Sequence, residues 1–257
     1  MNRILESWGK FVEEIDPSTI DLSSFKLKTT LNKDIWNKMG RLRSEIREKL
    51  IQIAEDFFEA LDLPNHVDLK DITFTGSLAN FNWSQFSDVD LHLIIDFGEV
   101  DEDHELVKKF FDNARMNWNK LHDIMVFDHE VEIYIQHMGE PHISSGVYSI
   151  YDNDWLVKPS KERPEIKWDE VKQKAAYIMD EIDEVSRLYS DGEFQEAREF
   201  AIKLKEKIAC MRKCGLEQGG EFSTENISFK ALRRNGSLEQ LNAYKDGSYD
   251  KIMSMRD

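Results

Sequence analysis

The sequence predicts an α/β fold of the α+β type, and three observations lead to that prediction. Short segments rich in β-branched and aromatic residues alternate with amphipathic helical segments through the middle of the chain. A charged segment interrupted by prolines follows at residues 158–164. The remaining third has helical periodicity almost throughout. Strands that alternate with helices, followed by helices alone, are typical of a sheet domain joined to a helical lobe.

A long amphipathic helix is predicted before the strands, from residue 41 to residue 61. Its apolar residues recur at steps of three and four, at Leu42, Ile46, Leu50, Ile53, Ala54, Phe57 and Leu61. The helix ends before Pro64, because proline cannot continue it. Residues 1–38 indicate a shorter helix and a connecting segment.

The middle of the chain predicts strand, helix, strand, helix, strand and then a hairpin. The strands are expected at residues 72–75, 91–97 and 131–135, and the hairpin at 147–157. A turn at Gly76-Ser77 opens a helical turn, and the spacing of Val107, Phe110, Phe111, Ala114 and Trp118 predicts a helix over 106–121.

The proline-interrupted linker divides the chain into two predicted domains, residues 1–160 and residues 161–257. In the second domain, residues 168–189 and 193–213 have strong helical patterns separated by Asp191-Gly192. We expect a glycine-rich loop at residues 215–220 and shorter helices after it.

Composition narrows the class of partner. The chain carries 50 acidic and 34 basic residues, a formal charge of -16, which disfavours extensive nucleic-acid binding unless basic residues cluster locally. Neither a signal peptide nor a membrane-spanning run is evident, so we expect no membrane partner. Cys210 and Cys214 are too few for a disulfide scaffold and are expected to be free thiols rather than zinc ligands, which predicts a cytoplasmic protein.

Carboxylates at the start of the second strand carry the clearest chemical signal. Asp88 and Asp90 are two residues apart, so in a strand their side chains share one face, together with that of His92. Glu132 lies between Val131 and Ile133 in a later strand. Hard cations prefer oxygen ligands, and a third carboxylate would complete a two-metal site for in-line attack on phosphorus.

Gly76 and Ser77 form a turn that suits a phosphate group. Glycine lets the backbone approach an anion closely, while a serine hydroxyl and backbone N–H groups donate hydrogen bonds to it. Phosphoryl transfer needs mainly positioning and charge neutralisation, so a phosphate turn beside metal-binding carboxylates is sufficient in principle.

This combination resembles the DNA polymerase beta-like nucleotidyltransferase superfamily. Its pattern is hydrophobic-Gly-Ser, about ten residues, Asp-hydrophobic-Asp, and later an acid between hydrophobic residues; here these are Phe74-Thr75-Gly76-Ser77, Asp88-Val89-Asp90 and Val131-Glu132-Ile133. The resemblance covers residues 71–136, and the helical third resembles the second lobe of such enzymes.

The resemblance implies a metal-dependent transfer of a nucleoside monophosphate from an NTP. It implies that Ser77 contacts the triphosphate and that Asp88, Asp90 and Glu132 hold two Mg²⁺ ions, with Mn²⁺ as the alternative metal. The run from Phe74 to His92 also resembles nucleotidyltransferase-like proteins of large tailed bacteriophages, which implies a bacterial host cytoplasm. A non-catalytic nucleotide-binding or virion-associated protein, and a purely structural one, remain alternatives.

Several assignments stay open at the level of the sequence. Glu132 fits the pattern better than Glu130, which we expect in the outer shell of the site. His92 is expected to be solvated or to contact the metal ligands without binding the metal itself, because magnesium prefers oxygen. Lys203 and Lys207, one turn apart on a helix, are candidates to bind the triphosphate, against the alternative of a solvated helix face. The acceptor is a small molecule, another nucleotide, a protein hydroxyl or an RNA end.

Overall fold

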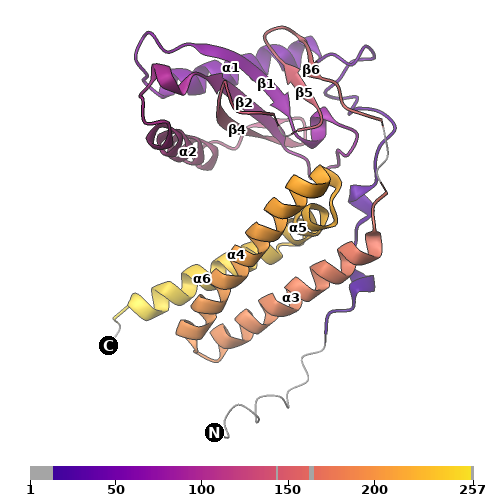
Figure 1. The fold of residues 1–257 in the computed structure, drawn as a ribbon, viewed down its shortest axis with the longest axis vertical. Helices are drawn as coiled ribbons and strands as arrows, with labels where there is room; N and C mark the ends of the chain where they lie inside the picture. Colours follow the sequence, from indigo (N-terminus) through magenta and orange to yellow (C-terminus); the bar gives the residue numbers. More distant parts are fainter. Residues whose placement is uncertain (1–13, 143, 162–164, 256–257) are drawn as a thin grey trace, which may run out of the picture. The chain divides into compact units, whose positions relative to one another are not determined.

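We describe the fold from a computed structural model, which describes residues 14–142, 144–161 and 165–255. The chain forms two compact units, which we call the sheet unit, residues 24–163, and the helical unit, residues 1–23 and 164–257 (Figure 1). Sequence analysis grouped the N-terminal residues with the sheet, whereas residues 14–23 contact the helices. The Ile15 N–H donates to Asp180 Oδ1 at 2.9 Å, and Lys172 Nζ donates to the Ser18 carbonyl at 3.3 Å.

The predicted N-terminal helix lies partly at residues 1–13, outside the described residues. Between residues 14 and 38 the structure contains short 3-10 turns, η2 (Pro17–Thr19) and η3 (Ser23–Phe25), and an irregular segment after them. Proline at the first position of η2 and the side chain of Asp16, which accepts from the Ser18 N–H, favour such a turn.

A six-stranded mixed sheet forms the centre of the sheet unit, which confirms the α+β class. Its strands are β1 (Leu69–Thr75), β2 (Val89–Ile95), β3 (Met125–Val126), β4 (His129–His137), β5 (Val147–Ser149) and β6 (Asp154–Val157). They lie in the order β3-β4-β2-β1-β5-β6, and only β2 and β4 are parallel among these pairs. Helix α2 (His104–Leu121) makes the crossover that a parallel pair requires.

One face of the sheet packs against α2 and α1 (Ser44–Ala60) to form the core. Alternate residues of the second strand face this core, where Val89, Leu91, Leu93 and Ile95 are fully buried. Period-two alternation therefore directs Asp90 and His92 to the opposite face. The strand begins two residues earlier than predicted, since Val89 and Asp90 already pair with β4. It also ends two residues earlier, because the chain turns at η5 (Phe97–Glu99), capped by Asp96.

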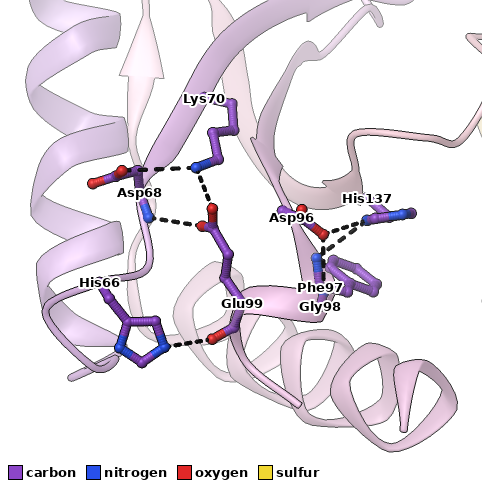
Figure 2. A network of polar contacts seen from close by, with 8 residues as sticks. All are labelled: His66, Asp68, Lys70, Asp96, Phe97, Gly98, Glu99 and His137. Carbon is purple, nitrogen blue, oxygen red and sulfur yellow. Dashed lines mark hydrogen bonds and ion pairs between the residues drawn. The ribbon is translucent and has the colours of Figure 1, made fainter. Parts of the chain in front are cut away.

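Polar contacts hold the end of the sheet that is remote from Asp90. Figure 2 shows Glu99 between Lys70 and the backbone of Asp68: Lys70 Nζ lies 2.6 Å from Glu99 Oε1, and the Asp68 N–H donates to Glu99 Oε2. The Phe97 N–H donates to His137 Nδ1 on β4 at 3.1 Å. The acidic loop after β2 is thus anchored to β1 and β4, and it serves as a structural clamp.

The described part of the helical unit contains four α-helices, which pack side by side (Figure 1): α3 (Trp168–Ser190), α4 (Phe194–Gly219), α5 (Thr224–Arg234) and α6 (Ser237–Met253). The prediction of a glycine-rich loop from residue 215 is wrong, because α4 continues to Gly219 and the short turn η6 (Gly220–Phe222) follows. Gly215 is buried in the packing of α4 against α5, where an added Cβ would lie 2.5 Å from Glu225 Cβ. This glycine serves close approach of helices, not a turn.

Two further observations bear on the expected class of protein. Cys210 and Cys214 are free and exposed on α4, with their sulfur atoms 3.9 Å apart. Across the part of the chain that the structure describes, no helix combines the length and the apolar character needed to cross a membrane.

Candidate active site

The pairing register of the sheet brings the predicted carboxylates together. Asp90 on β2 lies directly beside Glu132 on the parallel strand β4, and His92 lies beside Tyr134. Neighbouring strands are about 4.8 Å apart, so side chains at matched positions on one face are adjacent. Asp88 is half-buried and immediately precedes β2. Asp90 and Glu132, which have 41 residues between them in sequence, thus become neighbours on the face opposite the core.

The Gly76 turn packs directly under the Asp90 carboxylate. Gly76 has φ +76°, and an added Cβ would lie 1.7 Å from Asp90 Oδ2. Its N–H donates to Ser144 Oγ at 3.3 Å, in the loop after β4. Glycine is therefore required here both for its backbone conformation and for the space that the carboxylate occupies.

Ser77 opens a single turn of 3-10 helix, η4 (Ser77–Ala79), rather than a long helix. Its hydroxyl donates to Ser87 Oγ at 2.7 Å, and the Ser84 N–H donates to the same oxygen at 2.9 Å. These bonds tie the predicted phosphate turn to the residue just before Asp88. A three-residue turn has little helix dipole, so any phosphate contact would depend on the Ser77 hydroxyl and local N–H groups.

His129 is a buried residue that sequence analysis did not single out. Its Nδ1–H donates to the Ser87 carbonyl at 2.6 Å, and its Nε2 accepts from Asn32 Nδ2 at 3.2 Å. His129 thereby joins three segments: the residues before β2, the start of β4, and residues 24–43, which we call the N-terminal arm of the sheet unit. No pattern in the local sequence marks His129 as a buried linking residue, and only its tertiary contacts reveal this role.

Negative charge accumulates at this end of the β2–β4 pair. Partial burial raises the pKa of Glu130, and the carboxylates of Glu132 and Asp88 raise it further. The Tyr134 hydroxyl donates to Glu132, and burial together with that hydrogen bond raises the tyrosine pKa well above its ordinary value. Glu130 is nevertheless the more exposed of the two glutamates, whereas Glu132 is half-buried and registered with Asp90.

As the side chains lie, these residues do not form a ready metal cage. Within the described ranges, no three His, Cys, Asp or Glu side chains lie close enough together to hold a metal ion. Glu132 Oε2 accepts from the Tyr134 hydroxyl, and the other oxygen of its carboxylate can still bind a cation. The donor set is nevertheless all oxygen and strongly anionic, which suits a hard divalent cation.

A pocket of about 300 Å³ lies on the sheet beside these carboxylates, and sequence analysis missed its basic residues. Lys108, Asp112 and Arg115 of α2 line it, together with Thr75, His92, Tyr134 and His142. The Arg115 guanidinium lies 4.8 Å from the centre of the Tyr134 ring. Lys108, Asp112 and Arg115 are four and three residues apart, so they form a polar stripe on one face of α2. The spacing alone does not predict which part of the protein this stripe borders.

The polar groups of this pocket are internally paired. Arg115 Nε lies 2.9 Å from Asp112 Oδ1, and Lys108 Nζ lies 3.2 Å from Glu140 Oε1. His92 Nδ1 donates to Gln136 Oε1 at 3.1 Å, and burial lowers the His92 pKa to about 4. His92 is therefore neutral at pH 7, and the positive charge of the pocket comes from α2.

The two candidate lysines lie in the helical unit. Both are exposed on α4, and Lys207 Nζ forms an ion pair with Glu181 Oε2 at 2.7 Å and lies 4.6 Å from the Tyr177 ring centre. Their contribution to triphosphate binding stays a prediction.

Comparisons with known proteins give no relative from which a role for this site could be transferred. No protein-family model, no curated protein sequence and no solved structure matches the chain.

Proposed function

We propose that the chain is a metal-dependent nucleotidyltransferase with a polymerase-beta-type core, which moves a nucleoside monophosphate from an NTP to a hydroxyl acceptor. One observation carries the proposal: Asp90 is flanked by Glu132 in the parallel register and by the Gly76 turn beneath it. A phosphate turn and registered carboxylates are thereby adjacent, as transfer of a phosphoryl group requires.

In the proposed reaction the acceptor hydroxyl loses its proton to solvent, and its oxygen forms a bond to the α-phosphorus. The bond between that phosphorus and the oxygen bridging the α- and β-phosphates breaks, and pyrophosphate leaves. Asp88, Asp90 and Glu132 would hold the Mg²⁺ ions, which supply charge neutralisation at phosphorus. Ser77 would orient the triphosphate. Arg115 and Lys108, which line the pocket beside Tyr134, would offset part of the remaining charge.

Release of pyrophosphate tests the proposal. We would incubate the full chain with each of the four NTPs, Mg²⁺ or Mn²⁺, and a cell extract as the source of acceptors. Labelled nucleotide would then be followed into small molecules, nucleotides, protein and RNA. We expect pyrophosphate release with at least one NTP and its loss in the folded double variant Asp88→Asn, Asp90→Asn.

A matched control removes two other aspartates. Asp68 and Asp101 are exposed and lie at the opposite end of the β1–β2 pair. The variant Asp68→Asn, Asp101→Asn should retain activity. No release from the wild-type chain with any NTP, or equal release from both double variants, would remove the catalytic proposal.

A second candidate, a nucleotide-binding protein without catalysis, has one observation in its favour. Among the described residues, no three His, Cys, Asp or Glu side chains lie close enough together to hold a metal ion. In that case an NTP should raise the melting temperature, with a smaller increase in Ser77→Ala, while no pyrophosphate appears.

A further inference from the structure

A second and larger pocket, of about 780 Å³, lies within the sheet unit on its N-terminal arm. We call it the basic pocket, because its charged lining residues are Lys33, Lys38, Arg43 and Lys161. Its volume falls in the range of pockets that bind small ligands or parts of larger ones. None of the residues proposed for nucleotidyl transfer lines it.

The charge of the basic pocket is opposite to that of the chain. The lining contains four cations and no Asp or Glu among its described residues, while the formal charge of the chain is -16. Arg43 pairs with Glu45 at 2.8 Å. Among described residues, Lys33, Lys38 and Lys161 form no ion pair with a carboxylate, and Lys161 Nζ lies 5.8 Å from the Phe81 ring centre. Such a local cluster is the condition under which an acidic protein can hold a phosphate chain.

Apolar side chains form the rest of the lining. Leu31 and Met39 contribute to it, and Met39 is 85% exposed, whereas Trp36 and Phe81 are only 3% and 9% exposed and add little accessible surface. Cations beside exposed apolar side chains suit a single strand, because its phosphates can contact the cations while its bases lie against the apolar side chains.

The walls of the basic pocket are fixed in place by hydrogen bonds. Trp36 Nε1–H donates to the Leu78 carbonyl at 2.8 Å, and the Lys28 N–H donates to the Phe81 carbonyl at 2.7 Å. Trp83 Nε1–H donates to the Thr30 carbonyl at 2.8 Å. The arm is thereby anchored to the segment that begins at Ser77, so a ligand in the basic pocket would lie against the same short segment as the phosphate turn.

We propose that the basic pocket binds a short stretch of single-stranded nucleic acid, with the three lysines on phosphates and bases against the apolar lining. This binding goes beyond the proposed transfer reaction and does not depend on it. It is measured without metal or NTP, so its failure and the failure of the transferase proposal are separate results.

The test uses the full chain in EDTA and a fluorescent single strand of about six nucleotides, as DNA and as RNA, in anisotropy titrations. The variant Lys33→Gln, Lys38→Gln, Lys161→Gln should bind at least about tenfold more weakly and show a shallower salt dependence. The control, Lys49→Gln, Lys109→Gln, Lys120→Gln, removes the same charge from exposed positions on α1 and α2 and should bind as wild type does. Melting temperatures would establish that both variants fold.

Retained binding in Asp88→Asn, Asp90→Asn would support a site outside the carboxylate cluster. Equal weakening in both triple-lysine variants would overturn the proposal, since it would reflect overall charge alone. The same holds if the wild-type chain binds no strand, if a mononucleotide binds as tightly as the strand, or if inorganic polyphosphate of equal charge competes as well as the strand does.

Discussion

At the scale of single residues, Gly76 and Asp90 depend on each other. The carboxylate occupies the space where any other residue at position 76 would place its Cβ, and the backbone there has a positive φ. Two separate physical effects, steric overlap and backbone conformation, therefore act at one position. They can be distinguished, because Gly192 has φ +82° with no heavy atom within 4 Å of an added Cβ.

We expect Gly76→Ala to lower the free energy of unfolding by about 3 kcal/mol and Gly192→Ala by about 1 kcal/mol, because only the first adds a clash to the backbone strain. Urea unfolding of both variants measures the difference. Asp90→Ala in the Gly76→Ala background should recover part of the loss, as expected for residues in contact. Equal losses at the two glycines would contradict the close packing of Gly76 on Asp90.

His92 gives the site a pH-dependent stability. Its folded pKa, about 4, lies below the ordinary value of 6.5, so the unfolded chain binds more protons between these pH values. The stabilisation from neutral His92 is present above pH 6.5 and is lost as pH falls toward 4. Relative to His92→Gln, we expect the wild-type chain to lose about 2 kcal/mol more on going from pH 8 to pH 5.

Urea unfolding in metal-free buffer at several pH values measures this difference, and NMR titration of the His92 ring reports its pKa directly. Parallel stability profiles for the two proteins would show that burial does not control the protonation of His92.

At the scale of elements, α2 has two functions. Val107 and Phe111 pack into the core, while Lys108, Asp112 and Arg115 reach the pocket beside Tyr134. The same helix therefore packs on the core face of the sheet and also lines a pocket that contains His92 and Tyr134 of the opposite face. Helical periodicity predicted the core face, but could not predict that the polar stripe borders the carboxylates.

We expect Arg115→Gln and Lys108→Gln each to weaken binding of a non-hydrolysable NTP with Mg²⁺ about tenfold, because each removes a positive charge near the site proposed for the triphosphate. Lys109→Gln and Lys120→Gln, which alter exposed lysines of the same helix, serve as controls and should bind as wild type. Calorimetric titration measures the affinities. Unchanged affinity in Arg115→Gln and Lys108→Gln would contradict a role in NTP binding and leave these residues only their ion pairs with Asp112 and Glu140.

At the scale of the whole molecule, sequence patterns predicted what depends on local periodicity. The helices, most strands and the side of β2 that Asp90 occupies follow from residue spacing alone. The His129 hydrogen bonds and the basic pocket could not be predicted, because each joins segments far apart in sequence. The arm at residues 24–43 lacks regular periodicity, so its lysines gave no sign of converging with Lys161. The net charge did not indicate the basic pocket either, because a sum over 257 residues does not reveal a local cluster of opposite sign.

The parallel pairing of β2 with β4 also determines when the carboxylates can meet during synthesis and folding. Asp90 and Glu132 belong to strands joined through the whole of α2, and closing so long a loop costs entropy before any strand contact repays it. A growing chain that ends before β4 contains Asp88, Asp90 and the Gly76 turn without their third carboxylate. The assembled group is therefore a property of the completed sheet, and a truncated or partly folded chain would not present it.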